Sequence, residues 1–304
     1  MFLNKLSGEG LFDERPMTQT SLGRFVLWLE SVASPIIFRM GLSGIAMSRR
    51  ILLLLSLLAS TGLIASGQGS APSDPPASIS PAFSDNFSNG TLDTSKWFID
   101  TGRAPGNIKG INNGTLSAEH VDLSTGMLRL TLMQTVSGAL ATSVGAEIRS
   151  KQLFGYGTYA WVARAASTSA TPHGSGSAAS GSVTDVFNFI NDSESETDFE
   201  YQGQTPSTLE MTNFATVSKS QSTSTTVPGA DSNFHEYKFV WSRGRIEFYV
   251  DGTLVSTHTE NIPSAPAAAM INLWGTNSTS FGGAAIGGVT RYLYVSSFSY
   301  TPLP

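Results

Sequence analysis

The stretch SESETDFEYQG, residues 193–203, carries three carboxylates on alternate positions: Glu196, Asp198 and Glu200. In an extended strand successive side chains point to opposite faces, so these three share one face and the intervening Thr and Phe share the other. Acidic residues form strands poorly, and carboxylates on one face repel each other. The segment is therefore predicted to be a strand whose acidic face serves a function.

Glycoside hydrolysis with retention is one such function, because it needs two carboxyl groups about 5–5.5 Å apart. The Cα atoms of Glu196 and Glu200 would lie about 13 Å apart in an extended strand. Side chains that each lean ~4 Å inward close that gap to ~5 Å. Asp198 between them raises the cost of charging its neighbours and could share a proton with either. The run alone leaves two other interpretations open: a solvated acidic edge strand, and a calcium site built from three oxygens.

The composition of the whole chain favours an all-β protein. Of the 304 residues, 40% are hydrophobic and only 13% are charged, with 30 Gly and 14 Pro, a balance that suits strands and turns better than helices. The net charge of −5, without a basic block, argues against nucleic acid as the main partner. The absence of cysteine excludes disulfides, thiol nucleophiles and Cys-ligated zinc, and the four His residues are scattered without metal-ligand spacing.

The N-terminal part predicts export. Residues 47–67 read as a signal peptide: two arginines, an apolar run and small residues before a cleavage point after Gly67. Residues 1–46 are interpreted as an upstream extension from an early start codon, and residues 68–82 as a Ser/Pro/Gly-rich linker. The expectation is a secreted protein, extracellular or periplasmic after cleavage, with no stable membrane association. The apolar run is short for an uncleaved anchor, which is the alternative.

The remaining residues, 83–304, have the size of one β-sandwich or barrel domain. Residues 121–132 read as one hairpin, and residues 237–252 as two more with a tight Asp-Gly turn at their end. So many hairpins indicate an antiparallel, two-sheet protein. Residues 165–182 are low in complexity and lack apolar anchors, so they are expected to form a mobile loop.

These features together resemble glycoside hydrolase family 16, most closely its lichenase-like branch that cleaves mixed-linkage β-glucans. The branch signature is an uninterrupted Glu-x-Asp-x-Glu, matched by the acidic run. Further similar segments follow in order along the chain: residues 145–150, 154–159, 234–237, Trp241, 248–252, 261–263 and 270–274. The resemblance covers about residues 83–300. It implies a concanavalin A-like jelly-roll β-sandwich of two curved antiparallel sheets, with a polysaccharide cleft on the concave one.

The resemblance also implies roles for individual residues. Glu196 would be the nucleophile, Glu200 the acid/base, and Asp198 the residue that assists both. The implied substrate-binding residues are Glu147, Arg149, Asn113, Asn213, Tyr156 and Trp274. Alternatives stay open: Glu147 and Arg149 could form a cross-strand ion pair, Tyr156 could simply fill space between two glycines, and Trp274 could belong to the core. For Trp241 the core is the favoured interpretation.

The chain departs from the lichenase pattern at two cleft positions. Glu194 stands where lichenases carry Trp, and Phe189 where they usually carry Tyr. Residues 295–298 offer no acidic ligand for the calcium that some relatives bind, so neither a metal nor a cofactor is predicted. The prediction is a secreted, monomeric, retaining endo-β-glucan hydrolase. The alternatives are a transglycosylase on the same substrates and a non-catalytic carbohydrate-binding or cell-wall protein.

Overall fold

A computed structural model of the protein describes residues 80–191 and 193–304. The predicted extension, the signal peptide and most of the linker lie outside the described residues. The strands are β1 Phe83–Asp85, β2 Trp97–Asp100, β3 Gly102–Arg103, β4 Asn112–Leu116, β5 Val121–Asp122, β6 Leu128–Ser137, β7 Leu140–Phe154, β8 Gly157–Ser167, β9 Ser182–Ile190, β10 Ser195–Gln202, β11 Thr208–Thr216, β12 Lys219–Thr226, β13 His235–Ser242, β14 Arg245–Val250, β15 Thr253–His258, β16 Ala267–Gly275 and β17 Arg291–Pro302. One short 3₁₀ helix, η2 Ala118–His120, precedes β5.

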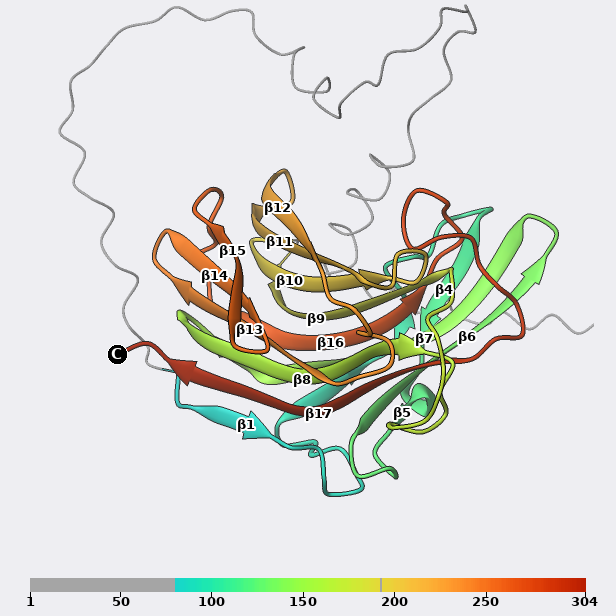
Figure 1. Cartoon of the computed structure of the whole chain (residues 1–304), viewed down its shortest axis with the longest axis horizontal. Helices are drawn as coiled ribbons and strands as arrows, with labels where there is room; N and C mark the ends of the chain where they lie inside the picture. The colour runs from blue at the N-terminus through green and yellow to red at the C-terminus, as the bar shows by residue number, and fades with distance from the viewer. Residues whose placement is uncertain (1–79, 192) are drawn as a thin grey trace, which may run out of the picture. The chain divides into compact units, whose positions relative to one another are not determined.

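Two mainly antiparallel sheets form the described domain, and β4 pairs in parallel with one end of β7. The inner sheet has the order β2-β7-β16-β9-β10-β11-β12. The outer sheet runs β15-β14-β13-β8-β17, and the other edge of β17 pairs with β6 and β1. Figure 1 shows both sheets bowed in the same sense, with the inner sheet inside the arc. We call the face of the inner sheet that points away from the outer sheet the concave face. The predicted all-β sandwich of two curved antiparallel sheets is confirmed.

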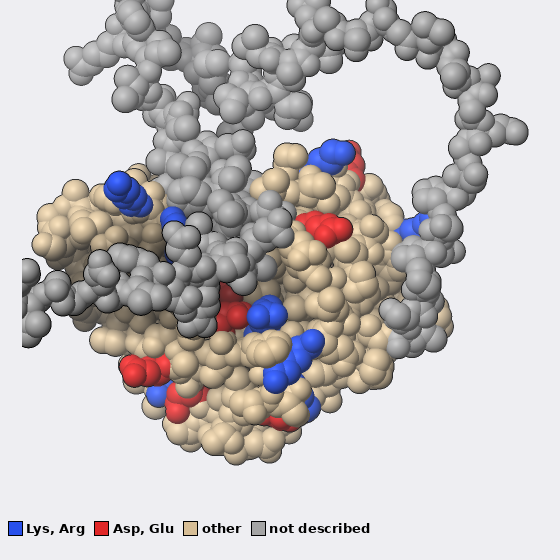
Figure 2. Space-filling model, turned by 180° about the vertical axis from the view of Figure 1, so that it is seen from behind, with Lys and Arg blue, Asp and Glu red and all other residues tan. Residues whose placement is uncertain are grey.

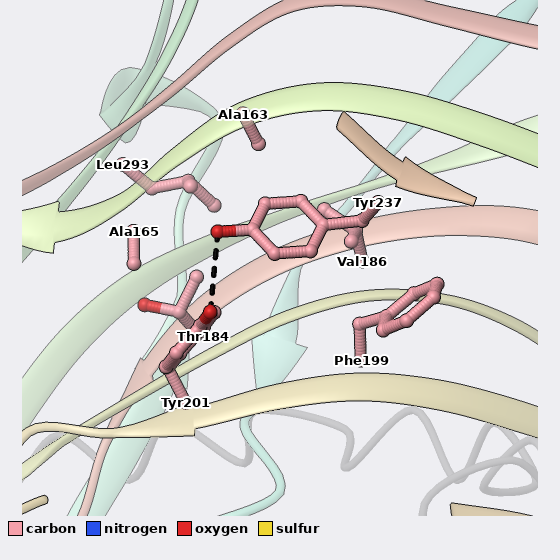
Figure 3. Close-up of a pocket in the computed structure, with 8 residues that line it drawn as sticks. All are labelled: Ala163, Ala165, Thr184, Val186, Phe199, Tyr201, Tyr237 and Leu293. Carbon is pink, nitrogen blue, oxygen red and sulfur yellow. Dashed lines mark hydrogen bonds between the residues drawn. The ribbon is translucent and has the colours of Figure 1, made fainter. Parts of the chain in front are cut away.

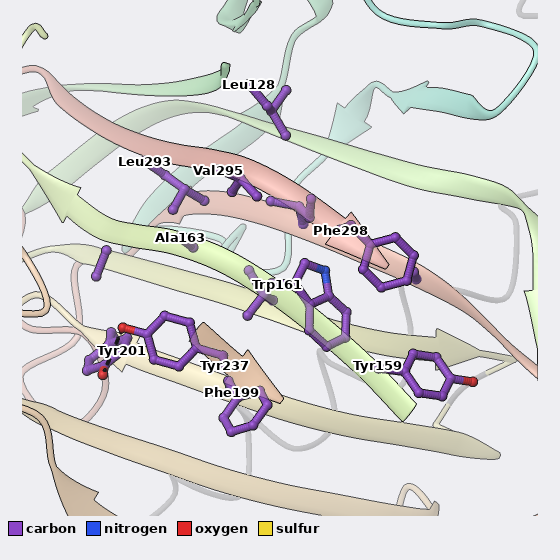
Figure 4. Close-up of a cluster of buried hydrophobic side chains, with 14 of the residues drawn as sticks. Leu128, Tyr159, Trp161, Ala163, Phe199, Tyr201, Tyr237, Leu293, Val295 and Phe298 are labelled. Atoms are coloured by element: carbon purple, nitrogen blue, oxygen red, sulfur yellow. Dashed lines mark hydrogen bonds between the residues drawn. The ribbon is translucent and has the colours of Figure 1, made fainter. Parts of the chain in front are cut away.

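The hydrophobic core lies between the sheets. On β13, Tyr237, Phe239 and Trp241 are buried while the residues between them are not, which is the alternation that a strand with one packed face requires. From the inner sheet, Phe199 and Ile148 reach the same cluster, part of which Figure 4 draws. The favoured interpretation of Trp241 as a core residue is therefore confirmed, and its indole N–H donates to the Pro263 carbonyl at 3.1 Å.

The predicted hairpins are confirmed by β5 with β6, and by β13, β14 and β15 in succession. The low-complexity segment, predicted to be a mobile loop, is hydrogen-bonded to a neighbouring strand. Arg164 on β8 is fully buried, and its guanidinium donates to the carbonyls of Pro172, Gly174 and Asp231 at 2.8–3.0 Å. Burial lowers the pKa of Arg164. A buried cation needs acceptors, and the loop's backbone supplies them in place of apolar anchors.

Within residues 80–191 and 193–304, no helix is both long and apolar enough to cross a membrane.

Candidate active site

Strand β10 carries the acidic run through the middle of the inner sheet. The segment is extended, as predicted, and pairs with β9 on one side and β11 on the other. Phe199 and Tyr201 point into the core, where they are 1% and 5% exposed. By strand alternation Glu196, Asp198 and Glu200 all point to the concave face. A packed aromatic face thus holds an acidic face in place.

A water-sized cavity lies behind this strand, between the two sheets. Figure 3 shows its lining, in which the Tyr237 hydroxyl donates to the Tyr201 hydroxyl at 3.3 Å. The cavity volume is about 10 Å³, the lower limit for one water molecule. Burial is the main reason that the pKa of both phenols is raised, so both remain protonated. This pair links the back of β10 to the outer sheet.

The register of the inner sheet sets the neighbours of each carboxylate. Glu196 lies opposite Phe189 and Phe214, so its surroundings on both adjacent strands are aromatic. Asp198 lies opposite Phe187 on β9 and Thr212 on β11. Directly opposed residues of an antiparallel pair have Cβ atoms about 4.5–5.5 Å apart. The environment at the Glu196 end is therefore largely apolar.

The surroundings of Glu200 are acidic instead. Asp185 on β9 and Glu210 on β11 lie directly opposite it. The Gln202 side-chain amide lies 3.4 Å from Glu200 Oε1 and 3.3 Å from Glu210 Oε1. The indole N–H of Trp274 donates to Asp185 Oδ2 at 3.2 Å. The two ends of the acidic run therefore differ in charge environment.

Glu147 and Arg149 lie on β7 with their side chains on the concave face. Asn272 Nδ2 donates to Glu147 Oε2 at 2.9 Å. Arg149 does not pair with Glu147. Its Nε and Nη2 donate to the two carboxylate oxygens of Asp100 on β2, at 3.0 and 3.1 Å, because Asp100 is diagonal to it in the register. The alternative of an ion pair between Glu147 and Arg149 is thus not what the structure contains.

Trp274 lies on β16, on the concave side, inside a small hydrophobic cluster. Phe281 stacks against the indole at a centroid distance of 5.9 Å, and Gly106 approaches it so closely that a Cβ there would lie 2.7 Å from the ring. Its described contacts are thus protein packing and the hydrogen bond to Asp185. Asn113 is exposed on β4 beside Thr142 of β7, and its role in binding stays a prediction.

Two predicted substrate-binding residues are not brought to the concave face. Asn213 lies opposite Thr197 and is fully buried; its amide donates to the carbonyls of Glu260 and Asn261. Neighbouring residues of a strand point to opposite faces, so a prediction that is off by one residue selects the wrong face. The residue of β11 that lies opposite Asp198 is Thr212, the neighbour of Asn213. Tyr156 packs edge-to-face on Trp241 at 5.0 Å, against the core.

The turn between β9 and β10 adds a polar contact at Glu196. Ser193 is fully buried, and its hydroxyl donates to Glu196 Oε2 at 2.5 Å. Glu194, the residue that replaces the expected Trp, accepts a hydrogen bond from the Asn191 side chain at 3.1 Å. The substitution therefore places a carboxylate in the turn itself.

Sequence reasoning missed Asp185, Glu210, Asn272 and Ser193. Glu210 lies between Leu209 and Met211, an alternation that predicts its face of the strand, whereas Asp185 has no such pattern around it. Their proximity to Glu200 depends on strand pairing.

Among the described residues, no group of three or more His, Cys, Asp or Glu is arranged to hold a metal ion. Figure 2 shows charged side chains scattered over the visible described surface, without a continuous basic patch.

Comparison with known proteins gives one consistent family. The model of the family described as "Glycosyl hydrolases family 16" matches residues 111–287. An endo-1,3-1,4-beta-glycanase, ExoK, of Rhizobium meliloti (strain 1021) is 31% identical over 204 residues, which is 65% of this chain and 70% of that relative. A beta-glucanase of Paenibacillus macerans is 30% identical over 199 residues, 63% of this chain and 78% of that protein. The solved Bacillus licheniformis beta-glucanase aligns with a TM-score of 0.62 at 26% identity, covering 74% of this chain and all of that one.

Proposed function

The chain belongs to glycosyl hydrolases family 16 and is a glycoside hydrolase, and from this premise we propose that it is a secreted, retaining endo-β-glucanase acting on β-1,3-1,4-glucan or a related β-glucan. The substrate class follows the printed names of the relatives, and the export follows the signal-like segment of residues 47–67. The observation that carries the mechanism is the extended strand β10, with three carboxylates on its concave face and aromatic core residues behind them.

Each carboxylate has a role in this proposal. Glu196 attacks the anomeric carbon, and Glu200 gives its proton to the leaving glycosidic oxygen. Glu200 then removes a proton from water as that water attacks the glycosyl-enzyme. Asp198 lies two residues from each glutamate on the same face, and it assists both by sharing a proton with either of them. No cofactor is needed, because the two glutamates supply the nucleophile and the acid/base.

The test is hydrolysis of a panel of barley β-glucan, lichenan, laminarin, xyloglucan, agarose and carrageenan, scored as new reducing ends. We expect release from the first two at least. Glu196→Gln should lose about 10³-fold or more in rate, and Glu200→Gln about 10²–10⁴-fold. Glu236→Gln, a partly exposed glutamate on the outer sheet, is the matched control and should hydrolyse at the wild-type rate.

Two measurements separate the roles. Glu200→Gln should regain much of its first-step rate on an aryl glycoside whose leaving group needs no proton, whereas Glu196→Gln should not. Proton NMR should show the β-anomer as the first product. Initial release of the α-anomer, or wild-type activity in Glu196→Gln, would refute the mechanism. Products longer than the starting oligosaccharide would identify transglycosylation.

A further inference from the structure

The turn that joins β9 to β10 brings a buried hydroxyl to one end of the acidic run. Glu194 N–H donates to the carbonyls of Ile190 and Asn191, which closes the turn tightly. Inside it, Ser193 is fully buried and its Oγ donates to Glu196 Oε2 at 2.5 Å. A hydroxyl bonded to a carboxylate makes one of the stronger hydrogen bonds in proteins.

Two residues of the turn have backbone angles that side-chain-bearing residues rarely adopt. Ser193 has φ +59°, and Asn191 has φ +38°, both in the left-handed region. That region costs a side-chain-bearing residue such as serine about 1–2 kcal/mol, and glycine avoids the cost. Glycine would adopt this backbone angle without the cost, but it lacks the hydroxymethyl group with which Ser193 contacts Glu196. Strain of this kind concentrates at functional sites, where surrounding structure holds it.

We infer that Ser193 is a positioning residue that speeds the second half of the reaction, the breakdown of the glycosyl-enzyme. This inference rests on the proposed function of Glu196 as the nucleophile. In that step the oxygen of water bonds to the anomeric carbon, and a proton of water passes to Glu200. The bond from the anomeric carbon to Glu196 breaks, and its electron pair returns to the carboxylate.

The charge on Glu196 explains the asymmetry between the two steps. In the glycosyl-enzyme the Glu196 side chain is a neutral ester, which accepts only a weak hydrogen bond. As the ester breaks, negative charge develops on the carboxylate, and a fixed donor stabilises that charge. In the first step the same hydrogen bond weakens as the carboxylate attacks. The Ser193 hydroxyl therefore favours release of the sugar over its capture.

The test compares Ser193→Ala and Ser193→Gly with the full-length wild type, using a 2,4-dinitrophenyl β-glycoside of a mixed-linkage glucan oligosaccharide. Stopped-flow release of the phenol measures the first step, and the steady state measures the second. Loss of a hydrogen bond to a charged group corresponds to about 10–100-fold. Both variants should slow the steady state by that factor, keep or exceed the first-step rate, and show a burst near one equivalent. Intact-protein mass spectrometry should show the accumulated glycosyl-enzyme.

The matched control is Ser124→Ala. Ser124 lies in the β5–β6 turn, where its hydroxyl also donates to a carboxylate, Asp122 Oδ2 at 2.8 Å, on the outer sheet. It should behave as wild type. If Ser193→Gly turns over like wild type and only Ser193→Ala is slow, the backbone and not the hydroxyl is responsible, and the inference is overturned. The same holds if neither variant accumulates the glycosyl-enzyme while wild type turns over through it. If wild type never forms one and Glu196→Gln stays active, the proposed function itself fails.

Discussion

At the scale of single residues, the charge around Glu200 separates its environment from that of Glu196. Asp185 and Glu210 face Glu200 from both neighbouring strands, and Asp198 faces it from its own. Arg149, a cation on the same face, is paired with Asp100. Negative charges near a carboxylic acid favour its protonated form, which suits the acid/base role proposed for Glu200.

Asp185→Asn should therefore move the alkaline limb of the pH profile of kcat/KM to lower pH, by about one unit. The reason is that the substitution removes one negative charge from the residue directly opposite Glu200, without a change of shape. The measurement is initial rate on barley β-glucan from pH 4 to 10.

Glu210→Gln is expected to act in the same direction. Asp122→Asn, on the outer sheet, serves as the control for a general change in charge. An alkaline limb that stays in place in Asp185→Asn, with the fold intact by circular dichroism, would show that this aspartate does not act on the acid.

At the scale of secondary-structure elements, a chain of side chains fastens the strands β11, β12 and β15 together. His258 Nδ1 lies 2.6 Å from Asn213 Oδ1, an acceptor, so the neutral ring carries its proton on Nδ1. Thr223 Oγ1 lies 2.8 Å from Nε2 and donates to it. Asn213 then donates to the carbonyls of Glu260 and Asn261. Asn213 thus serves the structure of the sheet edge.

The stability of this region should depend on pH through His258. Burial lowers its pKa from the ordinary 6.5 to about 4. Between these two values the unfolded chain binds a proton that the folded chain does not, so acidification lowers the free energy of unfolding; above pH 6.5 this effect is absent.

His258→Gln should be less stable than wild type at pH 8, and the difference should shrink by about 1–2 kcal/mol at pH 5. Urea unfolding at the two pH values measures it. His173→Gln, at an exposed histidine, is the control. A difference that is the same at both pH values would contradict the assignment of a buried neutral imidazole.

At the scale of the described domain, Arg164 joins segments that are distant in sequence. It leaves β8, and its guanidinium binds carbonyls of the loop 168–181 and of Asp231. Composition did not indicate these contacts, because the arginine that makes them lies outside the low-complexity segment. Small residues let the backbone come close to the guanidinium, so that its carbonyl oxygens can accept hydrogen bonds from Arg164.

Arg164→Met should lower the free energy of unfolding by about 2–4 kcal/mol, because several buried carbonyls lose their donor together. It should also speed proteolytic cleavage within residues 168–181. Arg245→Met, an exposed arginine paired with Glu247, should change stability by less than about 1 kcal/mol. Cleavage at the wild-type rate in Arg164→Met would mean that the loop does not depend on this residue.

Much of the fold and part of the site follow from local pattern. The hairpins of β5–β6 and β13–β15, and the extended acidic run of β10, are visible because a strand has a side-chain period of two and turns have their own residues. The faces of Asn213 and Tyr156 were not predictable in this way. The face of Asn213 depends on the register of β11, because a shift of one residue reverses the face of every side chain on a strand. The position of Tyr156 depends on how the β7–β8 turn packs against Trp241.

The sequence alone determined which carboxylates share a face, because side chains alternate between the two faces of a single strand. It did not determine which residues of the neighbouring strands lie opposite those carboxylates. Asp185 and Glu210 lie beside Glu200, and the Ser193 hydroxyl reaches Glu196, only because β9, β10 and β11 pair in one register around a tight turn. Strand register is a cooperative outcome of hydrogen bonds and core packing between distant segments, and no short stretch of sequence contains it.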